Sequence, residues 1–462
     1  MNERPTIPAE ELQTQRSYMD QVRAREDCPN RYHIVTYGCQ MNERDSESIA
    51  GMLEKMGMTP APTREEADLV LFNTCCVREN AENKALGNVI WLKELKKDKP
   101  ELLICVGGCM TQESGMAGRI KALYPFVDVV FGTHNMHLLP QYLFERLETR
   151  APVVEVLETD GCVVEGLPEK RGRSHSAFVN IMYGCDNFCS YCIVPYVRGR
   201  ERSRAPEAIL DEAKRLLDGG VKEITLLGQN VNSYRGGGAA FAELLGRLDA
   251  LGVPRIRFMT SHPKDLSDDL IAAYKTLPHL MPALHLPVQA GNDEVLRRMN
   301  RRYDRARYLD LVSRLRAAHP EIGLTTDIIV GFPGETEAQF EETMSLAREV
   351  RFDAAYTFIY SPRKGTRAAD FPDDTPQEEK TARIQRLIAL IQAISKETLD
   401  TQVGRRETVL VESVSPRDPK SVGGKTPRGH MVNFPGNDAL IGQFVDVEIT
   451  SSGKNTLRGR KI

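Results

Sequence analysis

The sequence predicts an α/β protein in three parts: an N-terminal parallel α/β sheet domain, a central partial (β/α)6 barrel and a small C-terminal all-β barrel. Two series of short apolar runs alternate with amphipathic segments, which is the βαβ pattern of parallel sheets. Residues 403–462 instead show β-branched alternation broken by Gly and Pro, as in small antiparallel barrels. At 462 residues the chain is too long for one ordinary core, so several domains are expected.

The N-terminal part begins with residues 1–30, a polar and partly helical extension that we expect to be loosely attached. Residues 31–150 form the first predicted domain, and residues 151–170, rich in Gly and Pro, form a predicted linker. Strands are expected at His33–Thr36, Leu69–Asn73, Leu102–Val106 and Val127–Phe131, with helices at Asp45–Met56, Ala81–Lys96 and Leu138–Leu147.

The central domain is predicted over residues 171–402 and the C-terminal barrel over residues 403–462. Strands of the partial barrel are expected at Ala177–Met182, Glu223–Leu227, Arg255–Met259, Ala283–Val288, Leu324–Val330 and Tyr356–Tyr360. The C-terminal segment holds ten Lys and Arg against six Asp and Glu, a net charge of +4. This balance is typical of an RNA-binding module, although a solvated face without a partner has the same composition.

Bulk properties exclude other classes of protein. The formal net charge is −3, so any affinity for nucleic acid must be local. No apolar run reaches the roughly 18 residues of a membrane-spanning helix, and the charged N-terminus lacks the apolar core of a signal peptide. We therefore expect a cytoplasmic protein with no membrane association, in which the 10 cysteines serve as ligands, catalytic groups or core residues rather than disulfides.

Three cysteines in one loop carry the strongest chemical signal. Cys185, Cys189 and Cys192 are spaced CxxxCxxC directly after a predicted strand, so one compact loop can place three thiols around one metal centre. Structural zinc prefers four ligands, whereas three thiolates suit a four-iron cluster with one open iron. The loop resembles that of the radical S-adenosylmethionine (radical SAM) superfamily, in which the cofactor binds the fourth iron.

A second set of cysteines lies in the N-terminal domain. Cys39, Cys75 and Cys109 each follow a predicted strand, and the separations of 36 and 34 residues match one βαβ unit. Parallel strands end at the same edge of a sheet, so the three thiols are expected at that edge, where a second four-iron cluster is possible. Turn or core roles are the alternative. Cys75 and Cys76 point to opposite faces of an extended segment, so at most one joins the set, and Cys105 is a predicted core residue.

Two glycine turns and one strand offer candidate cofactor contacts in the partial barrel. Gly228, Gln229 and Asn230 follow the second strand, and Asp327, Gly331 and Glu335 lie at the end of the fifth. His285 and Gln289 share one face of the fourth strand, opposite Leu284, Leu286 and Val288. Ordinary βα loops and packed polar residues are the alternative readings of these positions.

The chain resembles the methylthiotransferase family from about residue 31 to its end. The matching segments are TYGCQMNERDSE (36–47), NTCCVRENAENK (73–84), GGCM (107–110), GCDNFCSYCIVPYVRGRERSR (184–204), LLGQNVNSYRG (226–236), HLPVQAGND (285–293), TDIIVGFPGET (326–336) and a C-terminal barrel similar to a TRAM domain. The runs GQNVNSYRG and VREN are most similar to the branch that adds a methylthio group at C2 of N6-(dimethylallyl)adenosine at position 37 of tRNA, beside the anticodon.

The resemblance implies two [4Fe-4S] clusters, an auxiliary one on Cys39, Cys75 and Cys109 and a radical SAM cluster on Cys185, Cys189 and Cys192. It also implies S-adenosylmethionine, a tRNA anticodon stem-loop as substrate, an electron donor such as flavodoxin or ferredoxin, and a sulfur source; we expect a monomer.

Some questions stay open at the level of sequence. Arg198, Arg200, Arg202 and Arg204 are candidates to hold phosphates of the anticodon loop, or else a solvated surface with carboxylates such as Glu201. The alternatives for function are the ribosomal-protein aspartate branch, the threonylcarbamoyladenosine tRNA branch and, from another class, a non-enzymatic RNA-binding zinc protein.

Overall fold

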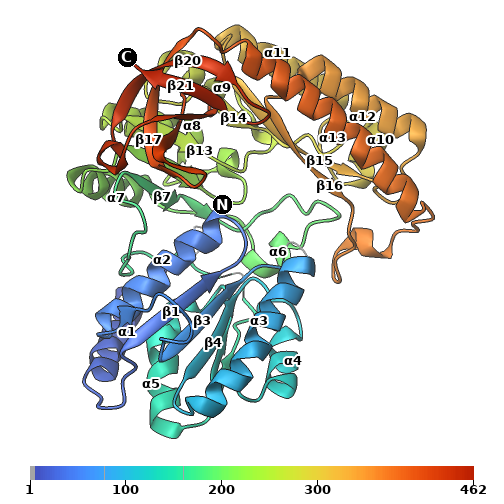
Figure 1. The fold of residues 1–462 in the computed structure, drawn as a ribbon. Helices are drawn as coiled ribbons and strands as arrows, with labels where there is room; N and C mark the ends of the chain where they lie inside the picture. Colours follow the sequence, from blue (N-terminus) through green and yellow to red (C-terminus); the bar gives the residue numbers. More distant parts are fainter. Residues whose placement is uncertain (1–5, 77–78, 160) are drawn as a thin grey trace. The chain divides into compact units, whose positions relative to one another are not determined.

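The computed structural model describes residues 6–76, 79–159 and 161–462, with the side chains of 79–81 left out. The chain forms two compact units (Figure 1). Unit 1 comprises residues 1–172, 182–186 and 192–204, and unit 2 comprises residues 173–181, 187–191 and 205–462. In the described part of the chain, no helix is long and apolar enough to cross a membrane.

Unit 1 is built on one parallel sheet in the order β2-β1-β3-β4-β5-β6. The strands are β1 (Arg31–Thr36), β2 (Thr59–Pro60), β3 (Leu69–Thr74), β4 (Leu103–Gly108), β5 (Val129–Phe131) and β6 (Val153–Glu155). The helices are α1 (Ala9–Arg23), α2 (Gln40–Lys55), α3 (Glu79–Asp98), α4 (Met116–Leu123), α5 (Leu139–Thr149) and α6 (Val194–Arg198), with the 3-10 turn η1 (Met136–Leu138).

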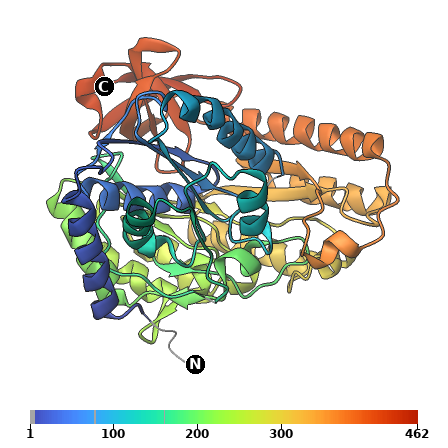
Figure 2. The same ribbon diagram turned by 90° about the horizontal axis from the view of Figure 1, so that it is seen from below.

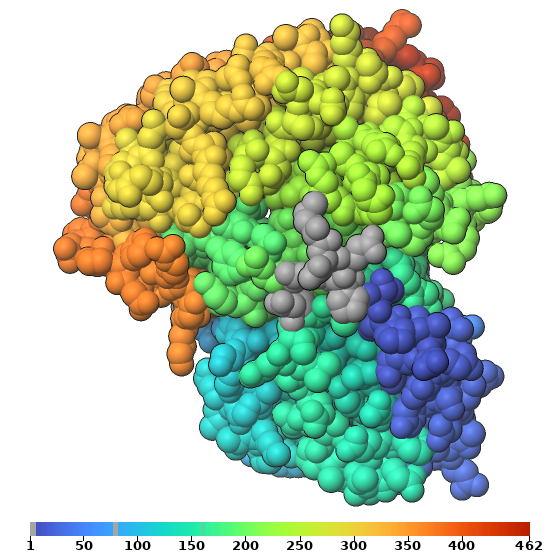
Figure 3. All heavy atoms as spheres, turned by 180° about the vertical axis from the view of Figure 1, so that it is seen from behind, coloured from blue at the N-terminus to red at the C-terminus, as the bar shows by residue number. Residues whose placement is uncertain are grey.

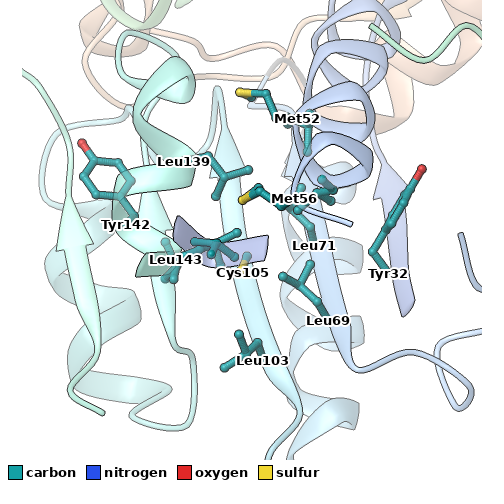
Figure 4. Close-up of a cluster of buried hydrophobic side chains, with 14 of the residues drawn as sticks. Tyr32, Met52, Met56, Leu69, Leu71, Leu103, Cys105, Leu139, Tyr142 and Leu143 are labelled. Atoms are coloured by element: carbon teal, nitrogen blue, oxygen red, sulfur yellow. The ribbon is translucent and has the colours of Figure 1, made fainter. Parts of the chain in front are cut away.

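Both faces of this sheet are covered, because successive strand residues point to opposite sides. Leu71 and Cys105 point toward α1, α2 and α5, where they pack with Met52 and Leu143 (Figure 4). Phe72 and the other residues of the opposite face pack against α3, α4 and α6. The prediction that Cys105 belongs to the core is confirmed, since its side chain is fully buried.

The N-terminal extension is not loosely attached, in contrast to the expectation. Its helix α1 buries Met19 and Val22 in the same core as α2 and α5. Arg25, just after α1, forms ion pairs with Asp27 at 2.8 Å and with Glu148 at 2.5 Å. The spacing of three residues between Met19 and Val22 gives a short apolar stripe, which is enough to dock a helix whose remaining surface is polar.

The region expected to be a linker also contributes to unit 1. Val153–Glu155 form β6, the edge strand that pairs in parallel with β5. A strand of three residues leaves too short an alternation to be recognised in the sequence. Unit 1 accordingly extends to residue 172.

Unit 2 contains the expected six parallel strands, arranged as two three-stranded sheets of order β13-β10-β7 and β14-β15-β16. They are β7 (Ser176–Asn180), β10 (Glu223–Leu227), β13 (Arg255–Phe258), β14 (Ala283–His285), β15 (Gly323–Val330) and β16 (Ala354–Ile359). A bridge between Ile256 and Leu280 joins the two sheets, so the partial barrel is confirmed.

Helices cover the outside of this barrel. They are α7 (Pro206–Asp218), α8 (Phe241–Ala250), α9 (Asp268–Thr276), α10 (Asp293–Arg298), α11 (Arg305–Ala318), α12 (Glu337–Val350) and α13 (Gln377–Asp400). Several begin at a side chain that caps the first turn; Thr336 and Gln339 form a reciprocal capping box at α12. The turn η4 (Arg367–Asp370) and its neighbours form an orange lobe on the surface of unit 2 (Figure 3), where the Ala368 amide donates to the Ser190 carbonyl at 2.8 Å.

The C-terminal barrel is closed in the order β17-β18-β19-β21-β20. Its strands are β17 (Arg406–Ser415), β18 (Asp418–Lys425), β19 (Met431–Pro435), β20 (Phe444–Ser452) and β21 (Leu457–Lys461), which follow α13 directly (Figure 2). Val409, Val432 and Phe434 belong to its core. Inside unit 2 the barrel is held by Asp353, which accepts hydrogen bonds from Arg428 at 2.7 Å and His430 at 2.9 Å.

Candidate metal and cofactor sites

Cys39, Cys75 and Cys109 lie at one edge of the unit 1 sheet. Each follows the carboxyl end of its strand, β1, β3 or β4, and these strands are neighbours in the sheet. The parallel βαβ arrangement therefore brings together three residues separated by 36 and 34 positions, as the spacing predicts.

Asn42, in the first turn of α2, lies among the three thiols. Its Oδ1 is 3.5 Å from Cys39 Sγ and 4.0 Å from Cys109 Sγ. A Cβ atom placed on Gly38 would lie 3.1 Å from both Cys75 Sγ and Asn42 Oδ1. The Asn42 amide group donates to the Thr74 carbonyl at 2.9 Å, which fixes the side chain between the ends of β3 and α2.

The glycine before Cys109 is required by the close approach of two strands. Gly108 has a φ of +102°, and a Cβ there would lie 2.5 Å from the Thr74 carbonyl oxygen and 2.6 Å from Asn73 Oδ1. Only glycine fits this space and this backbone conformation. The turn lets the Cys109 amide donate to the Thr74 carbonyl at 2.9 Å, which sets Cys109 next to the end of β3.

A buried arginine meets this thiol set. Arg198, the last residue of α6, is only 5% exposed. Its Nε donates to Cys109 Sγ at 3.2 Å, and its Nη2 is 2.8 Å from Asp45 and 3.3 Å from Asn42 Oδ1. The pKa of Cys109 is lowered to about 6, chiefly by a hydrogen bond from Cys76 and also by the positive charge of Arg198, against the effect of burial.

Cys76 is closer to the set than the sequence indicates. Its side chain is fully buried in the core that also contains Cys109. The hydrogen bond that it donates to Cys109, together with burial, raises the Cys76 pKa well above its ordinary value. The hydrogen bond between the two thiols therefore shifts their pKa values in opposite directions.

The chemistry of this donor set fits an anionic metal-sulfur cluster. Thiolates are the ligands of iron-sulfur clusters, and a buried cation with N–H donors stabilises the negative charge that such a cluster carries. Within the residues that the structure describes, no three His, Cys, Asp or Glu side chains are already arranged as metal ligands; the thiols instead contact Asn42, Arg198 and Cys76.

The CxxxCxxC loop is divided between the units, with Cys185 and Cys192 in unit 1 and Cys189 in unit 2. On the unit 1 side, β8 (Met182–Tyr183) pairs with β9 (Arg202–Ser203). Gly184 has a φ of +71°, and a Cβ there would lie 2.1 Å from the Arg200 carbonyl oxygen. The Cys185 amide donates to the Gly199 carbonyl at 3.1 Å.

On the unit 2 side, Cys189 is accompanied by Arg301, which the sequence analysis did not single out. Arg301 is 8% exposed. It donates to Cys189 Sγ at 3.4 Å and to the Pro287 carbonyl at 2.8 Å. Asn300, in the left-handed region with a φ of 57°, donates to the Phe188 carbonyl at 2.8 Å. The sequence feature that contains Arg301 is the basic run RRMNRR at 297–302. Such a run usually indicates a solvated surface, so it does not predict a buried arginine beside a thiol.

The next candidate cofactor residues lie after β10. Gly228, Gln229 and Asn230 follow the end of this strand directly, as predicted. Asn230 is almost fully buried and donates from Nδ2 to Asp265 at 2.7 Å, while its Oδ1 is buried without a hydrogen-bond partner. An unsatisfied buried acceptor is a position where a ligand donor is favoured.

Polar side chains also gather on the β14–β15–β16 sheet. Asp327 Oδ2 lies 3.4 Å from His285 Nε2, and the Tyr356 ring meets the His285 ring edge-on at 6.0 Å between centroids. Gln289 has a φ of 70°, a conformation that costs free energy in a residue other than glycine and often marks a functional position. The backbone amide of Gln289 donates to the backbone carbonyl of Asp327 at 2.9 Å.

The side chain of Glu335 points back toward Gly331, within the turn that follows β15. Its carboxylate accepts the Gly331 amide at 2.6 Å and lies 3.9 Å from Arg383. Burial raises the pKa of Glu335 to about 7, against the hydrogen bond from Gly331 and the charge of Arg383. The described contacts make Glu335 a support of the turn that contains Gly331.

The arginine run at 198–204 is mostly internal, so the expectation that it holds phosphates is wrong for three of its four members. Arg198, Arg202 and Arg204 are 5–6% exposed. Arg204 forms two hydrogen bonds with Glu165 at 2.7 and 2.6 Å. Arg200 has a side chain 41% exposed and forms an ion pair with Asp186 at 3.0 Å. The VREN segment at 77–80 lies outside the residues whose side chains are described.

Comparison with known proteins agrees with this architecture. Family models match the Radical SAM superfamily over residues 179–347, Uncharacterized protein family UPF0004 over 31–132 and the TRAM domain over 400–462. The tRNA-2-methylthio-N(6)-dimethylallyladenosine synthase of Clostridium botulinum (strain Okra / Type B1) is 52% identical over 435 residues, 93% of this chain and 97% of the relative. The protein of that name from Thermoanaerobacter sp. (strain X514) is 49% identical over 461 residues, 99% of this chain and 98% of the relative.

Among solved structures, the radical S-adenosylmethionine methyltransferase TsrM from Kitasatospora setae, with cobalamin and a [4Fe-4S] cluster bound, has a TM-score of 0.53 and 14% identity. The match covers 74% of this chain and 77% of that one, and it shows a likeness of fold.

A partial barrel that carries the CxxxCxxC loop, together with a closed C-terminal barrel, defines a radical SAM protein with a TRAM domain. This class uses S-adenosylmethionine and a [4Fe-4S] cluster. Within it, the chain belongs to the family of tRNA-2-methylthio-N(6)-dimethylallyladenosine synthases, as identities near 50% over nearly the whole length show. The resemblance to the methylthiotransferases is thereby confirmed.

Proposed function

We propose that the chain is a tRNA methylthiotransferase that adds a methylthio group to C2 of N6-(dimethylallyl)adenosine beside the anticodon. The observation that carries this proposal is the near full-length identity of about half the residues with proteins of that name. The substrate is tRNA, consistent with the exposed basic residues of the TRAM barrel: Arg406, Arg417, Lys420, Lys454, Arg458 and Lys461.

The two cysteine sets are proposed to hold two [4Fe-4S] clusters. Cys185, Cys189 and Cys192 are assigned to the radical SAM cluster, and Cys39, Cys75 and Cys109 to the auxiliary cluster. Support comes from Asn42, which contacts the thiols of Cys39 and Cys109, from Cys75 Sγ beside Gly38, and from the buried guanidinium beside a thiol in each set. Cleavage of S-adenosylmethionine supplies the radical chemistry that an unactivated aromatic C2–H bond requires.

Protein side chains bind and orient the cofactor and the base. We assign cofactor contacts to Gly228, Gln229, Asn230, Gln289, Asp327 and the turn from Gly331 to Glu335. Asn230 offers a buried acceptor, Gln289 is held in a strained conformation against Asp327, and Glu335 keeps the Gly331 turn closed. A stacked adenosine must also leave its stack to be modified, as enzymes that act on bases require.

The proposed reaction also requires partners other than this chain. Reduction of a cluster requires an electron donor such as flavodoxin or ferredoxin, and a methylthio product requires a sulfur source. We further propose that the protein works as a monomer in the cytoplasm, with the auxiliary site at residues 31–150, the radical SAM domain at 171–402 and the RNA-binding domain at 403–462.

The test is anaerobic reconstitution followed by counting of iron and sulfide and by incubation with reductant, S-adenosylmethionine and tRNA containing N6-(dimethylallyl)adenosine. Nucleosides are then analysed by mass spectrometry. About eight irons per chain and a C2-methylthio product are expected. Binding of only about four irons would refute the auxiliary cluster, and unmodified tRNA with about eight irons bound would refute the substrate.

A further inference from the structure

We propose that Arg198 is a positioning residue for the auxiliary cluster, and that α6 links it rigidly to the radical SAM cysteine loop. This inference rests on the proposed function, because it assumes a cluster on Cys39, Cys75 and Cys109. Arg198 contacts Cys109, a proposed ligand of the auxiliary cluster. It also lies six positions after Cys192, a proposed ligand of the radical SAM cluster.

The contacts of the guanidinium leave it one orientation. Nε donates to Cys109 Sγ at 3.2 Å, and Nη2 is shared between Asp45 at 2.8 Å and Asn42 Oδ1 at 3.3 Å. Asn42 is also the residue that accepts from Cys39. A single planar group therefore connects the thiol of Cys109 to two α2 side chains, Asp45 and Asn42, of which Asn42 contacts Cys39.

The backbone of Arg198 is held equally firmly within unit 1. Val197 and the residue before α6, Ile193, are buried in the core beneath β3 and β4. Thr133 Oγ1 donates to the Val197 carbonyl at 2.6 Å, and the buried guanidinium of Arg202 donates to the Arg198 carbonyl at 3.1 Å. Because α6 begins two residues after Cys192, this helix fixes that end of the loop relative to the guanidinium on Cys109.

The charge of Arg198 gives the contact a measurable consequence. In this buried site, the guanidinium of Arg198 balances the negative charge of Asp45, and a cluster would add further negative charge next to the same guanidinium. A fixed cation stabilises the more reduced, more negative state of a cluster and so raises its reduction potential. Arg198 is thus expected both to orient Cys109 and to set the potential of the auxiliary cluster.

The experiment uses the full chain with Cys185, Cys189 and Cys192 replaced by Ala, so that only the auxiliary cluster remains. Arg198→Gln and Arg198→Lys are compared with this parent, and Arg204→Lys serves as the matched control because Arg204 is an equally buried arginine of the same run that is paired with Glu165. Iron and sulfide are counted, and the electron paramagnetic resonance spectrum and the midpoint potential of the reduced cluster are recorded. Fluorescence of Trp91, the one tryptophan of the chain, monitors the folding of unit 1.

Arg198→Gln is expected to lower the midpoint potential, to change the spectrum and to weaken iron retention against a chelator by about 10-fold. Arg198→Lys should restore part of the potential, and Arg204→Lys should leave it at the parent value. An unchanged spectrum and potential in folded, iron-loaded Arg198→Gln would overturn the inference and leave the proposed function intact. A parent that binds no iron would overturn the auxiliary cluster and the inference together.

Discussion

Arg301 donates a hydrogen bond from Nη1 to the sulfur of Cys189 over 3.4 Å, within unit 2. Arg198 makes the corresponding contact to Cys109 in unit 1. Each proposed cluster site therefore contains a buried arginine directed at one thiol. Because the two arginines belong to separate sites, their substitution should separate the two halves of the reaction.

Replacing Arg301 with Gln should impair cleavage of S-adenosylmethionine while leaving the auxiliary cluster loaded. The change removes the donor to Cys189 and leaves the Pro287 carbonyl with one partner fewer, at a cost of about 1–3 kcal/mol. The measurement is 5′-deoxyadenosine production together with iron content. Arg302→Gln is the neighbouring control, and equal rates of cleavage in the two variants would contradict the role of Arg301.

Replacing Cys39 with Ala should abolish formation of the methylthio nucleoside but spare cleavage of S-adenosylmethionine. Cys39 belongs to the set proposed for the auxiliary cluster, whereas the proposed function assigns cleavage to the CxxxCxxC loop. Both products can be quantified by mass spectrometry in one reaction. Loss of both activities, with the radical SAM cluster still bound, would show that the two sets do not act separately.

Replacement of Cys75 and replacement of the adjacent Cys76 should have sharply different effects on the iron content. Cys75 is a proposed ligand, while Cys76 is a buried thiol that donates a hydrogen bond to Cys109. Cys76→Ala is therefore expected to keep about eight irons per chain, and Cys75→Ala to keep about four. Iron counting after matched reconstitution decides between them, and the reverse pattern would assign Cys76 as the ligand.

The stability of unit 2 should fall as pH rises toward neutrality because of Glu335. Burial raises the pKa of Glu335 from 4.5 in the unfolded chain to about 7 in the folded protein. The resulting contribution to the free energy of unfolding is complete below pH 4.5, where the carboxyl is neutral in both states, and is lost as pH rises through about 7. The difference is about 3 kcal/mol. Urea unfolding of cluster-free protein between about pH 4 and pH 8, the range that brackets both pKa values, should show the slope.

Glu335→Gln retains an acceptor for the Gly331 amide and should flatten this pH dependence. The transition of unit 2 is followed by near-ultraviolet circular dichroism, while Trp91 fluorescence reports unit 1 as an internal control. The same slope in the variant and the parent would show that another group titrates.

Asp353→Asn should loosen the C-terminal barrel from the rest of unit 2. Burial alone would raise the pKa of Asp353, but hydrogen bonds from His430 and Arg428 lower it, so the ionised carboxylate stabilises the fold above about pH 4 and this contribution is lost as pH falls further. Removing one partner of such a buried pair costs about 3–5 kcal/mol. Limited proteolysis should release the barrel more readily than in Glu448→Gln, which breaks the exposed pair with Arg460. Equal release would contradict the role of Asp353.

Local patterns were sufficient for the longer strands and for the common sheet edge of the unit 1 cysteines. The runs at Leu69–Asn73 and Leu324–Val330 correspond to β3 and β15 almost to the residue, because apolar runs bounded by turns are decided locally. The common edge of Cys39, Cys75 and Cys109 followed from the direction of parallel strands.

The arginines at the sites were not predictable in this way. Arg198 contacts Cys109 across 89 residues of sequence, and Arg301 contacts Cys189 across 112. A basic run is usually solvated, and nothing within a local window shows that a carboxylate such as Asp45 will be buried beside it. The same reasoning applies to α1, whose docking depends on only a few apolar residues.

Closure of the C-terminal barrel has a consequence for how partners are recognised. Each of its five strands, all within the described chain, has a hydrogen-bonded neighbour on both sides. An extended peptide therefore finds no free strand edge there to extend the sheet, and neither does a second copy of the barrel. Recognition by this domain falls to side chains that project from a closed surface. If the barrel binds RNA as proposed, substitutions on that surface can change which RNA it binds without exposing a strand edge that promotes aggregation.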